Sequence, residues 1–324
     1  MEQALATLAH TLRASAGLAG KADIAQVAAR LGLSGAGAVP VGDDCAALPD
    51  GDGWLLLAIE GFMNGFVAGD PWFAGWCGVM VNASDIAAMG GRPLAVVDAV
   101  WADGEDGAAP VLEGLAAASS AFGIPVVGGH TNIRNDRGQL SVAILGRAKR
   151  LLTSFDATPG QRLVAGIDLR GRYRAPFDNW EAATDAPSGR LRGDLEVLPL
   201  IAEAGLSRAA KDISQGGIVG TAAMLAECSQ VGIALDLAAV PRPEGVDLAR
   251  WLLTFPSFGY LLAADPQDVP ALVARFAARG IAAADIGAVT ADRRVTLSDG
   301  SGSETIWDFT QRPLLGCAPT GAAA

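Results

Sequence analysis

Two adjacent carboxylates in the segment Val41–Ala46 are the side chains best suited to metal chemistry. Asp43 and Asp44 follow Gly42, which permits a tight backbone turn, and they precede an apolar stretch. Adjacent like charges repel each other, and a divalent cation with oxygen ligands relieves that repulsion. An ordinary acidic turn is the alternative interpretation, so the doublet alone leaves both open.

A predicted helix over residues 75–89 carries polar groups among apolar ones. Asn82, Asp85 and Met89 lie near one face of this helix, because residues three and four positions apart are neighbours. Solvent-facing positions for the two polar residues are the alternative, although the neighbouring side chains are mostly apolar. The feature by itself is evenly balanced between a site and a surface.

Two further segments combine glycines with polar side chains. A predicted strand, Ile124–Val127, runs into Gly128–Thr131, where backbone N–H groups can approach a phosphate closely. His130 lies in this segment, and a lone loop histidine is more often structural than catalytic. Lys211–Gly217 precedes a predicted helix over residues 218–228, whose amino terminus suits an anion but is equally an ordinary helix cap.

Composition excludes several classes of function. The 324-residue chain carries a formal charge of −11, which disfavours nucleic acid as a partner. Its four cysteines form no CxxC pair, which disfavours a zinc site and a disulfide scaffold. We find no basic, apolar leader and no uninterrupted apolar stretch of about 18 residues. These features predict a cytoplasmic protein without a membrane partner.

The common catalytic signatures are missing from the sequence. No GxxxxGK[ST] loop, kinase signature set or GxGxxG in a strand-to-helix context is present. With His10 in a predicted helix and His130 beside glycines, no Ser-His-Asp or Cys-His arrangement is found either.

Alternating strands and helices must position these residues. The length favours two domains, and the 51% hydrophobic content with 41 glycines suits an α/β protein. Two amino-terminal helices within residues 2–31 are expected to flank the first domain. We place the domain boundary near residue 150, giving domains 1–150 and 151–324, and expect the tail from Arg312 to be poorly ordered. The predicted strands are 54–59, 94–100, 124–127, 140–145, 162–167 and 233–237, and the other predicted helices are 111–122, 194–204 and 266–279.

Together the motifs resemble the superfamily of aminoimidazole-ribonucleotide synthetase, thiamine-monophosphate kinase, selenophosphate synthetase and the hydrogenase-maturation carbamoyl dehydratase. The resemblance spans nearly the whole chain and rests on four segments in the family's order: Gly42–Ala46, Val81–Gly90, Gly128–Thr131 and Lys211–Gly217. It implies a two-domain α/β (α+β) fold of the PurM type, whose amino-terminal sheets pair in a homodimer, with a carboxyl-terminal α/β domain. It also implies ATP and Mg²⁺ as ligands.

The resemblance assigns roles to individual residues. Expected metal ligands are Asp43, Asp44, Glu60, Asp85 and Asp212. Expected nucleotide contacts are Gly42, Asp44, Asn82, Gly128, Gly129, Thr131 and Ser214. Expected catalytic residues are Asp43, His130 and Asp212.

Several positions depart from the characterised members. His130 stands where thiamine-monophosphate kinases carry an aspartate, and Gln215 replaces another, which removes two expected carboxylates. Ser34–Gly37 offers no reactive cysteine of the selenophosphate synthetase kind, and Cys317 is interpreted as incidental. Arg170–Trp180 combines guanidinium groups with an indole suited to an anionic or planar ligand, and a solvated loop is the alternative.

The sequence therefore predicts a Mg²⁺-dependent, ATP-binding enzyme that transfers a phosphoryl group to a small metabolite or activates it with phosphate. A catalytically inactive ATP-binding or partner protein of the same fold is one alternative. Thiamine-monophosphate kinase is another. The second substrate is not identified by any motif.

Overall fold

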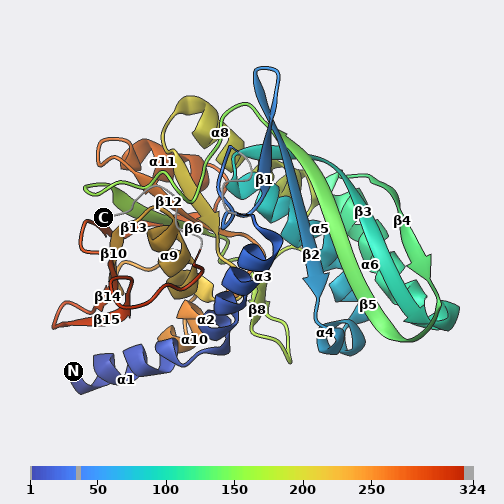
Figure 1. The fold of residues 1–324 in the computed structure, drawn as a ribbon, viewed down its shortest axis with the longest axis horizontal. Coiled ribbons are helices and arrows are strands. Elements are labelled where there is room, and N and C mark those ends of the chain that lie inside the picture. The colour runs from blue at the N-terminus through green and yellow to red at the C-terminus, as the bar shows by residue number, and fades with distance from the viewer. Residues whose placement is uncertain (1, 34–37, 317–324) are drawn as a thin grey trace. The chain divides into compact units, whose positions relative to one another are not determined.

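The computed structural model describes residues 2–33 and 38–316 and divides into two compact units. The five-stranded unit consists of residues 44–151 and 185–200, and the seven-stranded unit of 1–43, 152–184 and 201–324. This division differs from the predicted domains 1–150 and 151–324, because an amino-terminal segment and a later helix each join the other unit. Figure 1 shows the elements of both units.

The five-stranded unit is a mixed sheet with helices on one face (Figure 1). The strands lie in the order β1-β2-β5-β3-β4, and every pair is antiparallel except β3 with β4. The strands are β1 (Ala46–Asp50), β2 (Gly53–Phe62), β3 (Gly91–Asp103), β4 (Val126–Asn132) and β5 (Arg134–Ala148). The helices are α4 (Asn64–Gly69), α5 (Pro71–Ala88), α6 (Gly104–Phe122) and α7 (Ser188–Leu195).

Helix α5 is the centre of this unit. It begins where Asp70 caps the backbone N–H of Phe73 at 3.2 Å, and almost every residue from Phe73 to Ala88 is buried. Two glycines let it approach α6 closely: an added Cβ would lie 2.0 Å from a backbone oxygen at Gly75 and 1.9 Å from one at Gly114. A helix enclosed on all sides can hold a polar group in a fixed place.

The two faces of the sheet differ in what covers them. Side chains alternate along a strand, so Leu56 is fully buried against the helices while Leu57 is 49% and Ile59 is 69% exposed on the other face. Val97 on β3 and Leu145 on β5 share this second face through the strand register. We call it the outer sheet face, and the helix-covered one the inner sheet face.

The seven-stranded unit has a mainly antiparallel sheet in the order β15-β14-β10-β13-β6-β12-β9, in which only β10 and β14 pair in parallel. Its strands are β6 (Arg162–Ile167), β9 (Ala209–Asp212), β10 (Gly232–Asp236), β12 (Gly259–Ala264), β13 (Ala282–Thr290), β14 (Arg294–Ser298) and β15 (Ser303–Asp308). A small sheet combines β7 (Arg172–Tyr173), β8 (Asn179–Glu181) and β11 (Phe255–Pro256). The helices are α1 (Glu2–Arg13), α2 (Ala16–Ala19), η1 (Gly20–Ala22), α3 (Asp23–Leu31), α8 (Val197–Ala204, which begins in the five-stranded unit), α9 (Gly217–Cys228), α10 (Leu248–Leu252) and α11 (Val269–Ala277).

Helix α1 belongs to the seven-stranded unit, whereas the sequence assigned it to the first domain. It packs on β15, and its Leu5, Ala9 and Leu12 are buried in the same core as the residues of β6 and α9. These apolar positions lie at helical spacing, so the spacing predicted the helix but not the surface it covers.

Other elements differ in detail from their predictions. The helix expected over 194–204 is interrupted at Glu196, so that α7 and α8 are separate. The glycine segment after residue 127 continues as strand β4. Ser34–Gly37 and Cys317 lie outside the described residues. The helices of the described residues include none with the length and hydrophobicity that a membrane span requires.

The chain from Arg312 to Gly316 is held in place, contrary to the poor order expected of it. The carboxylate of Glu227, itself 3% exposed, accepts hydrogen bonds from the backbone N–H groups of Leu314, Leu315 and Gly316. Leu314 and Leu315 are buried. One buried charge thus fixes the end of the described chain.

Replacing this carboxylate should weaken the fold. Glu227→Gln keeps the shape but removes the charge from three hydrogen bonds, so the free energy of unfolding should fall by about 1.5–3 kcal/mol in urea titrations. Glu244→Gln, at an exposed position of the same unit, is the control and should change little. Equal stability of both variants would contradict an anchoring role for Glu227.

Candidate functional site

Asp44 and Asp85 bring two carboxylates together in the five-stranded unit. Their carboxylate oxygens lie within 4.8 Å of each other. Asp85 is 6% exposed on the enclosed helix α5, whereas Asp44 is half-buried in the chain leading to β1. Two acidic groups this close, one of them buried, repel each other unless a cation or a proton intervenes.

A sulfur contact holds Asp44 beside the helix. The backbone N–H of Cys45 donates to Sδ of Met89 at 3.1 Å, and both residues are buried. Met89 follows directly on α5 and donates its own N–H to the carbonyl of Asp85 at 3.3 Å. The residue after Asp44 is therefore tied to the turn of chain that carries Asp85.

Asn82 joins the helix to the sheet at the same level. It is fully buried, and its Nδ2 donates to the carbonyl oxygens of Gly78 at 2.8 Å and Val142 at 3.0 Å. Its Oδ1 accepts no hydrogen bond from any of the described residues. This buried amide oxygen is therefore an acceptor without a donor among the described residues. Asn82 lies about one helical turn from Asp85 on α5.

A row of residues crosses the sheet next to Asn82. Val142 on β5 is paired with Glu60 on β2 and with Asp98 on β3, and Asp98 is paired in turn with Gly129 on β4. Any side chain at position 129 would collide with the carboxylate, because an added Cβ would lie 2.7 Å from Oδ1 of Asp98. The expected ligand Glu60 thus has an acidic counterpart two strands away.

Asp98 was missed in the sequence. It stands inside the apolar stretch 94–100, and that single charged residue in a strand was the available signal. Burial raises the pKa of the Asp98 carboxyl above its ordinary value, and a hydrogen bond from its own backbone opposes the rise. A partly buried acid in this row adds to the acidic character of the inner sheet face.

His130 lies on the opposite face of the sheet from Asp98. It is paired with Ala99, whose side chain points to the opposite face from that of Asp98, so the ring of His130 projects from the outer sheet face. The centroids of the His130 and Trp101 rings are 5.9 Å apart. Within the five-stranded unit, the structure therefore does not bring His130 to the Asp44–Asp85 pair.

Gly128 and Thr131 are exposed positions of the same edge strand, paired with Val97 and Val100. Their backbone belongs to strand β4, whereas the sequence predicted that the strand ends at residue 127 and is followed by glycines whose N–H groups can approach a phosphate.

Asp43 is engaged within the seven-stranded unit. Its two carboxylate oxygens accept hydrogen bonds from Ser154, one from the backbone N–H at 2.8 Å and one from Oγ at 2.6 Å. Gly42 before it adopts φ 128°, a conformation that favours glycine. The ammonium of Lys211, a buried residue, lies 3.5 Å from the Gly42 carbonyl oxygen.

Asp212 and Ser214 lie at the end of β9 in the same unit. Asp212 is 3% exposed, and its carbonyl oxygen accepts a bond from Oγ1 of Thr221 on α9 at 3.2 Å. Oγ of Ser214 accepts a bond from Nζ of Lys21 at 3.2 Å. Gly217 then begins α9 with φ 62°, where the backbone of Leu252 leaves no room for a side chain.

The Arg170–Trp180 segment is part of the internal structure of the seven-stranded unit. Arg170 forms a two-pronged ion pair with buried Asp168, at 2.7 and 3.2 Å. Trp180 is buried, and its Nε1 donates to the Asp168 carbonyl at 3.1 Å. These contacts stabilise the chain's own fold, so the solvated-loop alternative was wrong for Trp180.

Comparison with known proteins relates both halves of the chain to one family. Residues 42–148 match the model of the AIR synthase related protein N-terminal domain, and residues 188–300 match that of the C-terminal domain. The chain is 48% identical over 318 residues to uncharacterized protein sll0787 of Synechocystis sp., covering 96% of this chain and 98% of that protein.

More distant relatives have named activities or ligands. The chain is 27% identical over 219 residues to the thiamine-monophosphate kinase of Methanospirillum hungatei, covering 64% of this chain and 72% of the kinase. It is similar in fold to T. maritima PurL complexed with ATP, with a TM-score of 0.71 and 21% identity, over 85% of this chain and 46% of PurL. The chain thus spans less than half of PurL, and this similarity establishes the fold alone.

The raised pKa of Asp98 predicts a pH-dependent stability. An acid whose pKa is raised in the folded state stabilises the fold while it is protonated, and this contribution is lost as the pH rises through the raised value. Asp98→Asn, which stays neutral, should therefore be more stable than the natural protein at pH 7, by less than about 1 kcal/mol because the group is partly exposed.

Thermal unfolding at pH 7 and pH 3 checks this expectation, since the difference between the two proteins should vanish at pH 3. A variant that is less stable at pH 7 would show that a cationic partner stabilises the ionised carboxylate.

Proposed function

This chain belongs to the family of AIR synthase related proteins, and we propose on that basis that it is an enzyme that uses ATP with Mg²⁺. The proposed reaction transfers a phosphoryl group to a small metabolite or activates that metabolite with phosphate. The named relatives support it, because one is a thiamine-monophosphate kinase and another binds ATP. The main structural support for the proposal is the short distance between the carboxylates of Asp44 and Asp85.

The donor set fits Mg²⁺. This ion is usually bound in proteins by one or two carboxylates together with substrate phosphates and water, and as a hard cation it prefers oxygen ligands. Asp44 and Asp85 supply two carboxylates whose oxygens lie within 4.8 Å, and a cation would offset their mutual repulsion. Oδ1 of Asn82, about one helical turn from Asp85 on α5, is a further buried oxygen. When bound, Mg²⁺ would supply charge neutralisation for the triphosphate.

The residues of the chain have separate proposed tasks. Asp44 and Asp85 bind and orient the metal-bearing end of the nucleotide, and α5 excludes water from behind Asp85. On the resemblance alone, Asp43, Glu60 and Asp212 are proposed as further metal ligands, and Gly42, Asn82, Gly128, Gly129, Thr131 and Ser214 as nucleotide contacts. Asp43, His130 and Asp212 are the proposed catalytic residues, and a small molecule is the proposed acceptor.

A second copy of this chain is the partner we propose for the outer sheet face. Leu57, Ile59, Val97 and Leu145 give this face an apolar character, and each is at least 39% exposed. Exposed apolar patches of this kind usually mark interaction surfaces, and the same patch on two subunits is self-complementary in a two-fold dimer. His130 lies on this face, so in the proposed dimer it faces the partner.

Removing the charge of Asp85 should weaken nucleotide binding that depends on Mg²⁺. With Asp85→Asn, the dissociation constant for a non-hydrolysable ATP analogue with Mg²⁺ should rise at least about tenfold, or about 1.4 kcal/mol. Isothermal titration calorimetry with and without Mg²⁺ measures it. Asp44→Asn, at a half-buried position, should behave alike and keeps the test valid if the buried variant unfolds.

Asp52→Asn is the matched control, because the Asp52 side chain is 99% exposed in the same unit. Unchanged Mg²⁺-dependent affinity in both the Asp44 and Asp85 variants would refute the metal assignment. Phosphate release from ATP across a pool of small metabolites that includes thiamine monophosphate separates the alternatives. ATP binding without turnover in every mixture would favour a catalytically inactive protein.

A charge on the outer sheet face should break the proposed dimer. Ile59→Asp should sediment as a monomer at micromolar concentration while the natural protein sediments as a dimer, because a carboxylate would be buried in the contact. Leu112→Asp replaces an apolar residue of α6 that is 40% exposed and should leave the dimer intact. A monomeric natural protein, or a dimeric Ile59→Asp variant, contradicts the proposal.

A further inference from the structure

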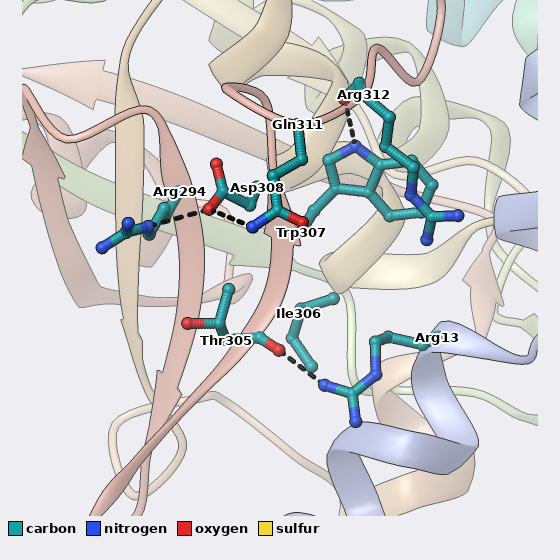
Figure 2. A pocket seen from close by; sticks show the side chains of 8 residues that line it. All are labelled: Arg13, Arg294, Thr305, Ile306, Trp307, Asp308, Gln311 and Arg312. Atoms are coloured by element: carbon teal, nitrogen blue, oxygen red, sulfur yellow. Dashed lines mark hydrogen bonds and ion pairs between the residues drawn. The ribbon is translucent and has the colours of Figure 1, made fainter.

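A pocket of the seven-stranded unit collects guanidinium groups that none of the motifs includes. Its volume is about 550 Å³, and it lies where the end of α1 meets β14, β15 and the chain that follows β15 (Figure 2). The lining residues are Arg13, Arg294, Thr305, Ile306, Trp307, Asp308, Gln311 and Arg312. This size lies within the range of small-molecule sites.

Asp308 is the only carboxylate among these lining residues, and its oxygens are already in use. It accepts bonds from Nε of Arg294 at 3.1 Å and from Nε2 of Gln311 at 3.2 Å, as Figure 2 shows. The pKa of this carboxyl is lowered, mainly by the hydrogen bond from the hydroxyl of Thr310 and to a lesser degree by Arg294. Asp308 therefore stays ionised near neutral pH and balances the charge of Arg294.

The other two guanidinium groups contact neutral partners. Arg13 donates to the carbonyl oxygen of Thr305 at 2.6 Å. Arg312 lies over the indole of Trp307, 4.0 Å from the ring centroid, and Trp307 in turn donates its Nε1 to the Arg312 carbonyl at 3.2 Å. Neither guanidinium pairs with a carboxylate in the part of the chain that the structure describes, and the pocket lining carries more positive than negative charge.

These arginines differ from ordinary surface arginines in how they are held. A solvent-facing arginine samples many rotamers, whereas the hydrogen bond of Arg13 and the ring contact of Arg312 restrict both side chains before any ligand arrives. A guanidinium fixed in this way offers its remaining N–H groups to the two oxygens of one anion. The surplus of positive charge is local, because the whole chain has a net charge of −11.

We propose that this pocket is a second ligand site, which binds a small phosphate monoester through Arg13 and Arg312. A phosphate dianion matches two uncompensated guanidinium groups better than a single carboxylate does, because both charges are then balanced. The volume exceeds that of a bare phosphate ion and leaves room for an organic portion beside it. The inference goes beyond the proposed use of ATP and shares no residue with that site.

Calorimetric titration with inorganic phosphate and with phenyl phosphate, both in EDTA, tests the proposal without the metal-dependent nucleotide site. Both anions should bind the natural protein, and phenyl phosphate should bind more tightly because its ring adds contact in the pocket. Arg13→Gln and Arg312→Gln should each weaken binding at least about fivefold. Arg242→Gln, at an exposed arginine of the same unit outside the pocket, is the control and should bind as the natural protein does.

Thermal unfolding of each variant shows whether it is folded. If Arg13→Gln does not fold, the result for Arg312→Gln, at an exposed position, decides the test. Absence of phosphate binding at millimolar concentration overturns the proposal. So does equal affinity in the natural protein and the folded pocket variants. Titration with succinate distinguishes the chemistry, since tighter binding of this dicarboxylate than of both phosphates would overturn the assignment to a phosphate monoester.

Discussion

Two carboxylates lie within 4.8 Å of each other in the five-stranded unit, and one of them is buried on the enclosed helix α5. Burying a charged group costs free energy unless an opposite charge or hydrogen bonds offset that cost. The surrounding structure holds the arrangement regardless: glycines bring α6 against α5, Asn82 ties α5 to β5, and Met89 ties the chain after Asp44 to the helix end. Such rigidity around like charges is typical of a cation site.

The pleat of the sheet separates the remaining chemistry. Glu60 and Asp98 belong to one row across the sheet, and Asp98 lies on the inner face with the helices. His130 lies on the outer face among apolar side chains. His130, which replaces an aspartate of the thiamine-monophosphate kinases, thus lies on the face for which we propose a dimer contact. Any effect of His130 on the reaction would therefore depend on dimer formation.

Local patterns predicted much of the fold. Strand β6 has the predicted limits, and α9 begins one residue earlier than expected, because the apolar pattern of a short stretch determines such elements locally. The place of α1 could not be predicted, since its leucines indicate that a face is buried but not against what. The buried Leu314 and Leu315 depend on Glu227, which lies far away in the sequence, and a short-range pattern cannot contain that contact.

The site was predictable to a similar extent. The motifs indicated Asp44 and Asp85, which the structure brings together. They gave no reason to treat Asp43 differently from Asp44, although the carboxylate oxygens of Asp43 accept hydrogen bonds from Ser154. Asp98 was hidden because one acid in a strand is a weak signal without its neighbours. The arginine pocket combines α1 with β14 and β15, and no local motif could join segments nearly 300 residues apart.

We propose that Asp44 and Asp85 hold a divalent cation against the phosphates of a nucleotide. In a crystal structure with Mn²⁺ and a non-hydrolysable ATP analogue, the anomalous signal of the metal would locate this cation. We predict an anomalous peak about 2.1 Å from oxygens of both carboxylates, with a phosphate oxygen as another ligand. A bound nucleotide with no metal peak at these two residues would contradict the account.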